Sequence, residues 1–269
     1  MIMANSSKAI NKTAAGVKVF FCGVGEAFDE NLANTSILIK FFCKGEFRFI
    51  LLDCGFTAAP AFWKVAPAPV ELDGIWISHL HGDHFLGLPQ LLIRFSEHAR
   101  EKKLYISGVK GIEEAVVSAM ELAYPGKIYK LPFKIIFSEP ELYRSFELSG
   151  IPARTFDIDH PVPCIGVRFD FEGKSLFYTG DGKVPDLARK IVRGCDLGIF
   201  ETYTLSAQKH GHNSVTEAAA FARSAGIKYL AAVHMNRDER QTKGHLVIEK
   251  LKQAGVQGFL PGPGDVVEL

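Results

Sequence analysis

Apolar residues are grouped along this chain into short runs that are typical of β-strands. Two of these runs are joined by Lys44-Gly45-Glu46, a turn sequence that predicts a β-hairpin. The strands predicted in this part of the chain are Val17–Cys22, Thr35–Cys43, Phe47–Leu52, Gly74–Ile77, Leu104–Ser107, Phe133–Phe137, Leu142–Leu148, Ala153–Ile158, Cys164–Phe171 and Ser175–Tyr178.

Helical periodicity interrupts the strands at intervals and becomes more frequent after Val184. Leu88, Leu91, Leu92 and Phe95 follow the spacing of one helix face, which predicts a helix from Leu88 to about Lys102. The other predicted helices are Ile112–Leu122, Val184–Arg193, Val215–Ala225 and about His245–Ala254. The strands predicted between and after the last three helices are Leu197–Glu201, Tyr229–Val233 and Val266–Leu269.

These elements predict an α/β fold of stacked sheets with outer helices, a four-layer αββα sandwich. With 47% hydrophobic residues in 269, the chain can bury a sizeable core. No Pro/Gly/Ser-rich linker divides it, so we expect one domain over residues 17–269. Residues 1–16 are rich in Ser, Asn, Lys and Ala, and we expect them to be disordered.

Charge and cysteine content exclude several classes of protein. Lys and Arg number 31 against 30 Asp and Glu, a formal net charge of +1, so no basic excess points to nucleic acid. No apolar run suits a signal peptide or a membrane span, which predicts a cytoplasmic protein without a membrane partner. The five cysteines form no CxxC pattern, and we expect reduced, buried thiols.

The strongest chemical signal is His79-Leu80-His81-Gly82-Asp83-His84, directly after the predicted strand Gly74–Ile77. Imidazole and carboxylate ligands together suit Zn²⁺ and other first-row divalent ions. Alternation along extended chain places His79 and His81 on the same side, and Asp83 and His84 follow the turn and can reach a second ion. A polar loop with Asp83 as a helix N-cap is the alternative, but it leaves three histidines unexplained.

Three further candidate ligands also follow apolar strands: His160, Asp181 and His234. Taken singly, each could be a loop, turn or strand-capping residue. Taken with the first cluster, they predict a site that gathers ligands at strand ends, where the scaffold is rigid. His98, His210 and His245 lie in polar segments, and we expect them at the surface.

The order of these residues resembles that of the metallo-β-lactamase superfamily, and the resemblance extends from about Val17 to the C-terminal region. Leu51-Leu52-Asp53-Cys54-Gly55 looks like the early strand-and-aspartate motif of this family, and Phe177-Tyr178-Thr179-Gly180-Asp181 looks like its later aspartate motif. An aspartate at position 181, rather than a cysteine, points away from true β-lactamases.

Within the superfamily, the chain is most similar to the ribonuclease Z and phosphodiesterase branch. The similarity lies in Phe200-Glu201-Thr202, in the segment that begins at His212-Asn213-Ser214, and in His234-Met235-Asn236-Arg237. The resemblance implies two divalent metal ions, Zn²⁺ being expected and Mn²⁺ or Fe²⁺ possible. The implied ligands are His79, His81, His160 and Asp181 for one ion, and Asp83, His84, Asp181 and His234 for the other.

The resemblance also implies catalytic roles for Asp83 and for a proton-donating pair, His212 and Glu201. Asp53 is expected to accept a hydrogen bond from a ligand histidine, although it could instead be a turn residue at a strand end. Catalysis would then use a metal-bridging hydroxide as the nucleophile, because a metal ion lowers the pKa of bound water to about 7.

The main departure is a missing segment. Most ribonuclease Z proteins carry a long arm that binds tRNA, between the positions matching His160 and Asp181, but only twenty residues lie between them here. Phe200 also stands where the branch has histidine, and Asn213 where it has serine. These departures and the near-neutral charge predict that tRNA is not the substrate. The sequence leaves open whether the protein forms a homodimer.

We therefore expect a dinuclear metal-dependent phosphodiesterase that acts on a small or single-stranded phosphodiester. The alternatives on the same site are a lactonase, a thioesterase or an arylsulfatase, and a ribonuclease Z-type tRNA 3′ endonuclease. A further alternative, from a different class, is a non-catalytic scaffold that retains a vestigial metal site.

Overall fold

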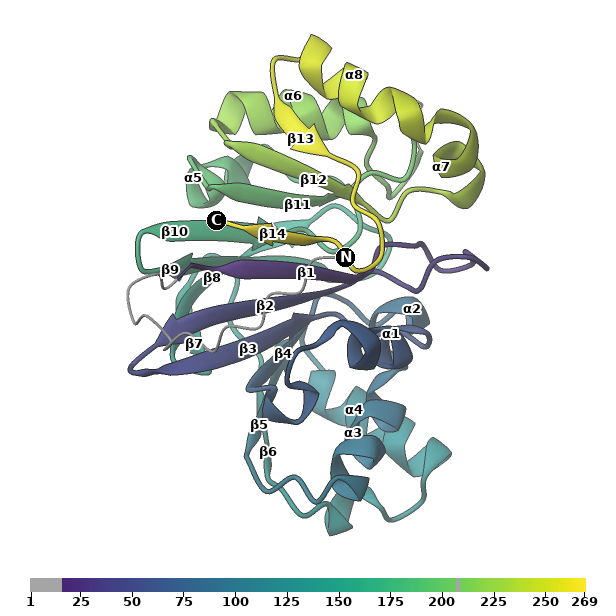
Figure 1. Ribbon diagram of the computed structural model, residues 1–269, viewed down its shortest axis with the longest axis vertical. Coiled ribbons are helices and arrows are strands. Elements are labelled where there is room, and N and C mark those ends of the chain that lie inside the picture. Colours follow the sequence, from purple (N-terminus) through teal and green to yellow (C-terminus); the bar gives the residue numbers. More distant parts are fainter. Residues whose placement is uncertain (1–15, 207–208) are drawn as a thin grey trace, which may run out of the picture.

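Two seven-stranded sheets stack face to face, and helices cover the outer face of each (Figure 1). The computed structural model describes residues 16–206 and 209–269. The arrangement is the αββα sandwich predicted from the sequence, and that prediction is confirmed. The predicted disordered segment, residues 1–16, lies outside the described residues apart from Gly16.

The first sheet has the strand order β14-β1-β2-β3-β4-β5-β6. Its strands are antiparallel from β14 to β3 and parallel from β3 to β6. Their bounds are β1 Lys18–Gly23, β2 Ser36–Cys43, β3 Glu46–Leu52, β4 Gly74–Ile77, β5 Leu104–Gly108, β6 Ile135–Ser138 and β14 Val266–Glu268.

The second sheet has the order β13-β12-β11-β10-β9-β8-β7. It is antiparallel from β7 to β10 and parallel from β10 to β13. Its strands are β7 Ser145–Leu148, β8 Ile151–Ile158, β9 Cys164–Phe171, β10 Lys174–Tyr178, β11 Leu197–Glu201, β12 Tyr229–Val233 and β13 Gln257–Phe259.

The core consists of three apolar layers. One lies between the sheets, where Phe21 and Trp76 of the first sheet and Phe169 and Ile199 of the second are fully buried. The other two lie beneath the helices on the outer faces. The helices are α1 Ala58–Val65, α2 Gly82–Phe85, α3 Leu88–Glu97, α4 Ile112–Ala123, α5 Arg189–Val192, α6 Val215–Ala225, α7 Arg237–Lys243 and α8 Val247–Gln253. None of those in the described residues is long and apolar enough to cross a membrane.

Two predicted helices differ from the structure in extent. α3 ends at Glu97 rather than near Lys102, because Ala99 adopts a left-handed backbone conformation, with φ of 51°. The helix predicted over Val184–Arg193 is a 3₁₀ turn, Asp186–Ala188, followed by the short α5. Neither difference changes the layers, because both segments still pack on the outer faces.

The parallel strands determine where the site forms. β3 and β4 in one sheet run parallel to each other, as do β10, β11 and β12 in the other, so the carboxyl ends of each group lie at one sheet edge. The two edges come together at Gly180, where an added Cβ would lie 2.5 Å from Cβ of Ser78. The strand ends of the two sheets therefore supply side chains to a common site.

Candidate metal centre

Seven metal-capable side chains gather at these strand ends and form two groups, which we call the outer and inner groups. Within each group, the donor atoms all lie within 4.8 Å of one another. The outer group is His79, His81 and His160; the inner group is Asp83, His84, Asp181 and His234.

In the outer group, His79 Nε2 lies 3.1 Å from His81 Nδ1, and His160 Nε2 lies 3.3 Å from the same atom. Two of the imidazole rings are oriented by contacts at Nδ1, the nitrogen that faces away from the group. His160 Nδ1 donates to the Gly211 carbonyl at 2.7 Å, and His79 Nδ1 lies 3.0 Å from Ser78 Oγ. These partners hold the proton on Nδ1 and leave Nε2 of His79 and His160 free to coordinate.

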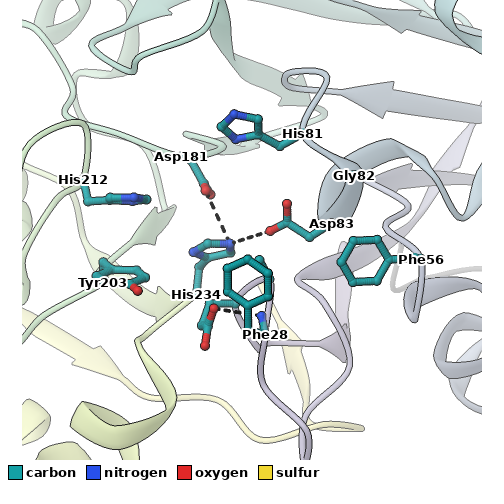
Figure 2. Close-up of a pocket in the computed structure, with 11 residues that line it drawn as sticks. Phe28, Phe56, His81, Gly82, Asp83, Asp181, Tyr203, His212 and His234 are labelled. Carbon is teal, nitrogen blue, oxygen red and sulfur yellow. Dashed lines mark hydrogen bonds and ion pairs between the residues drawn. The ribbon is translucent and has the colours of Figure 1, made fainter.

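In the inner group, His84 Nε2 lies 3.3 Å from both His234 Nε2 and Asp181 Oδ1. His234 Nε2 in turn lies 3.1 Å from Asp83 Oδ2 and 3.4 Å from Asp181 Oδ2 (Figure 2). All four side chains are buried. The inner group is therefore a closed cluster of two imidazoles and two carboxylates.

The donor set and its spacing fit divalent metal ions. Two ligands that are each about 2.0 to 2.1 Å from a tetrahedral Zn²⁺ lie about 3.4 Å from one another. The contacts within both groups fall close to this separation. Asp181 Oδ1 is also buried, and its 3.3 Å contact with His84 Nε2 does not have the geometry of a hydrogen bond, which is costly unless the oxygen coordinates.

Behind the inner group, the buried carboxylate of Asp53 organises the surrounding side chains. Its Oδ2 accepts hydrogen bonds from His84 Nδ1, Ser78 Oγ and Tyr178 OH, each at 2.7 Å. Its Oδ1 accepts from the Ser78 backbone N–H at 2.7 Å. The bond to His84 leaves Nε2 of that ring directed into the inner group.

The electrostatics of the two groups differ. Burial, followed by the neighbouring His84, lowers the pKa of His79 well below its ordinary value, so His79 is neutral. Burial opposes the charged form of His84 and His234, but Asp181, together with Asp53 for His84 and Asp83 for His234, outweighs it and raises both pKa values, that of His234 to about 9. Burial likewise opposes ionisation of Asp83 and Asp181, yet the facing histidines lower both pKa values, so both carboxylates are ionised.

A third feature lies beside the inner group. His212 Nδ1 donates to Glu201 Oε1 at 2.5 Å, and these two residues and Asp181 bring their donor atoms within 4.8 Å of one another. Glu201 is fully buried and also accepts the backbone N–H groups of Gly182 and Asn213. Tyr203 stacks on the His212 imidazole, with ring centroids 4.4 Å apart.

A cavity of about 410 Å³ opens over the inner group. Figure 2 shows His212 and Tyr203 on one side of it, Phe56 on the other, and Phe28 in front of His234. The sequence patterns did not identify Phe28, Phe56 or Tyr203, because pocket lining depends on how separate loops meet. Phe28 and Phe56 are exposed phenylalanines in loops, a property that only the structure reveals.

The other sequence expectations have mixed outcomes. His98, His210 and His245 are exposed, as predicted. All five cysteines are free thiols, but Cys43 is only half-buried. Asp83 lies within α2, whose N-cap residue is His81, so the N-cap alternative for Asp83 is wrong.

The family follows from comparison with known proteins. The model described as the beta-lactamase superfamily domain matches residues 48–235, well over half of the chain. This protein therefore belongs to the beta-lactamase superfamily, and the fold, the histidine–aspartate clusters and its relatives make it a metallo-hydrolase. The metal-binding hydrolase expected from the sequence is confirmed at this level.

Two curated relatives are both named ribonuclease Z. The protein from Metallosphaera sedula is 26% identical over 288 aligned positions, which cover 88% of this chain and 93% of the relative. That from Thermoplasma acidophilum is 27% identical, covering 82% of this chain and 87% of the relative. The predicted similarity to the ribonuclease Z branch is confirmed.

Solved structures of similar fold agree with this family assignment. A metallo-beta-lactamase fold protein from Bacillus subtilis, YhfI, superposes with a TM-score of 0.78 at 22% identity, covering 94% of this chain and all of that chain, and it shows the fold alone. The short form of human tRNase Z superposes with a TM-score of 0.74 at 25% identity, covering 93% of this chain and 98% of that chain.

Proposed function

We propose that this protein is a dinuclear metal-dependent phosphodiesterase that acts on a small or single-stranded phosphodiester. The observation that carries the proposal is the His212–Glu201 pair, which lies beside Asp181 at the edge of the two ligand groups. A metal centre alone suits many hydrolases, whereas a centre with an adjacent proton donor suits expulsion of a poor leaving group.

We assign one ion to His79, His81 and His160, and the other to Asp83, His84 and His234, with Asp181 as a ligand of both and Zn²⁺ as the expected metal. When bound, the ions supply Lewis-acid polarisation of the phosphoryl group and a nucleophile from water at neutral pH. Two divalent ions outweigh the charges of Asp83 and Asp181, so the site favours an anionic phosphodiester over an uncharged ester.

His212 is the proposed general acid. Its Nδ1 is held by Glu201, so Nε2 is free on the side of the cavity that His212 lines. The Glu201 carboxylate fixes the orientation of the ring, so that Nε2 can donate a proton to the departing alkoxide oxygen. General acid catalysis of this kind contributes about 10²- to 10⁴-fold in rate.

Two observations support a substrate smaller than tRNA. β9 and β10 form a simple antiparallel hairpin between His160 and Asp181, without an inserted arm. The alignment with the Metallosphaera sedula ribonuclease Z spans 288 positions, more than the 269 residues of this chain, so that relative has residues with no counterpart here.

A second candidate is a ribonuclease Z-type tRNA endonuclease. The observation that favours it is the similarity over most of the chain to proteins named ribonuclease Z and to human tRNase Z. Under this candidate, the arm that is missing here would be supplied by another chain.

A substrate panel on zinc-loaded protein tests the proposal. We expect turnover of bis(p-nitrophenyl) phosphate or cyclic nucleotides, and no comparable turnover of a lactone, a thioester or an aryl sulfate. Asp181→Ala is the control for the metal centre and should lose this activity. Hydrolysis of the uncharged substrates alone would overturn the proposal, and cleavage of precursor tRNA alone would establish the second candidate.

A further inference from the structure

Two exposed phenylalanines stand at the mouth of the catalytic cavity. Phe28 is 75% exposed and Phe56 is 44% exposed, and both line the cavity that also contains Asp83 and His212. A single exposed phenylalanine is ordinary on a protein surface. Two exposed phenylalanines that come from separate loops to one cavity give a flat apolar ligand group a surface to lie against.

Hydrogen bonds fix the backbone of the loop that carries Phe28, although the Phe28 ring is exposed to solvent. The Phe28 backbone N–H donates to Glu26 Oε2 at 2.9 Å, and Glu26 is buried and bound by Arg237 at 2.5 Å. Asp29 Oδ1 also accepts the backbone N–H groups two and three positions further along. The backbone at Phe28 is therefore held beside the cavity, while its ring is mostly exposed.

The Phe56 ring lies against the turn at Gly82, between the candidate ligands His81 and Asp83. A Cβ added at Gly82 would lie 3.2 Å from the Phe56 ring and 2.9 Å from Leu86. The ring therefore lies over the backbone between His81 and Asp83, where glycine leaves room for it. Leu86, which is 46% exposed, adds apolar surface on this side.

Few cationic side chains lie at the mouth of the cavity. Among the described residues that line it there is no lysine or arginine, the nearby Arg237 is paired with Glu26, and Lys209 lies with its Nζ 4.3 Å from the centroid of the Tyr203 ring. Phe28 is followed directly by Asp29 and Glu30. Long nucleic acids are held mainly through their phosphates by cationic side chains, so this rim suits a ligand with one phosphodiester and one flat ring.

We propose that Phe28 and Phe56 form an aromatic clamp for the nucleobase of a small nucleoside phosphodiester. The inference rests on the proposed phosphodiesterase function and names its substrate class. The cavity volume of about 410 Å³ falls at the lower end of small-molecule sites, about 300 to 1,000 Å³. Because stacking uses the face of the base, the clamp accepts different bases.

The test compares two diesters with the same leaving group, thymidine 5′-p-nitrophenyl phosphate and methyl p-nitrophenyl phosphate, on zinc-loaded protein. We expect kcat/KM to be higher for the thymidine diester, and this preference to fall about tenfold in Phe28→Ala and in Phe56→Ala, in line with stacking contributions elsewhere. Phe28→Tyr should retain the preference. Phe42→Ala is the matched control, because Phe42 is 38% exposed on β2 and does not line the cavity.

The outcomes separate the clamp from the proposed function. Equal kcat/KM for the two diesters, or an unchanged preference in both alanine variants, overturns the clamp and leaves the phosphodiesterase standing. If neither diester is cleaved, the proposed function fails, and binding of thymidine 5′-monophosphate by calorimetry decides the clamp. Binding of this nucleotide that is not weakened in either alanine variant also overturns the clamp.

Discussion

Replacement of Asp53 by asparagine should weaken metal binding without touching a ligand. Asparagine suits this position because φ at Asp53 is 56°, a conformation that asparagine tolerates better than alanine. An amide at the Oδ2 position cannot accept the hydrogen bonds from His84, Ser78 and Tyr178, and only the bond from the Ser78 N–H is retained.

The magnitude follows from the lost bond to His84. A hydrogen bond to a charged group contributes about 1.5 to 3 kcal/mol. Loss of the carboxylate partner of a ligand histidine typically reduces metal affinity by about 10- to 100-fold. We therefore expect zinc affinity in Asp53→Asn to fall within this range. We also expect a loss of about 1 to 3 kcal/mol in unfolding free energy, from the buried donors left unpaired.

Competition with a chromophoric chelator measures the affinity, and urea unfolding of metal-free protein measures the stability. Asp73→Asn is the matched control. Asp73 is equally buried and accepts from the Phe49 N–H, but it precedes β4, whereas the metal ligands follow that strand. The control should lose stability and keep zinc affinity. Wild-type zinc affinity in a folded Asp53→Asn protein would refute the role given to Asp53.

Four further predictions concern His212, His234 and Ser214. On a diester with an alkoxide leaving group, such as a cyclic nucleotide, His212→Ala should lower kcat by about 10²- to 10⁴-fold with unchanged metal content, and the exposed His210→Ala in the same loop should change neither kcat nor metal content; metal loss in His212→Ala would contradict its role. His84 and His234, whose pKa values are both raised, must each release a proton to coordinate, so zinc affinity should rise by at least about tenfold per pH unit below about pH 9, and a flat profile between pH 6 and 8 would contradict this. In metal-free protein, the raised pKa of His234 stabilises the folded state. This stabilisation is complete below about pH 6.5, the pKa of histidine in the unfolded chain, and should be lost as the pH rises through about 9. Thermal unfolding measured over this pH range would detect the loss. Ser214→Ala should cost about 1 kcal/mol in urea unfolding, because Ser214 caps α6 at the Glu217 N–H, and an unchanged midpoint would argue against the cap.

The layers and the clustering of the candidate ligands were predictable because each rests on local pattern. Short apolar runs mark strands whose ends release a ligand, and parallel strands in one sheet bring such ends to one edge. His160, Asp181 and His234 were found in this way, as single polar residues after apolar runs. Their assembly with His79–His84 required only that the two sheets stack.

Other elements carry no such pattern. α7 Arg237–Lys243 contains no apolar residue, and the Asn236 side chain caps it. α1 Ala58–Val65 contains a proline, and β13 has only three residues. These elements are stabilised by caps and tertiary contacts, which hydrophobic periodicity does not record.

The aromatic residues of the cavity were missed for a related reason. Phe28 and Phe56 belong to loops that meet only after the sheets have stacked, so their proximity is a tertiary property. The pairing of His212 with Glu201 came from a resemblance rather than from spacing. The structure brings this pair to hydrogen-bonding distance.

The most direct test of the central claim is a titration of metal-free protein with Zn²⁺ that records bound metal and diester hydrolysis together. The account assigns two ions to the outer and inner groups, so we predict two Zn²⁺ per chain and full hydrolysis of thymidine 5′-p-nitrophenyl phosphate only as the second ion binds. Full activity with a single bound ion, or no diester hydrolysis with both ions bound, would contradict a dinuclear phosphodiesterase.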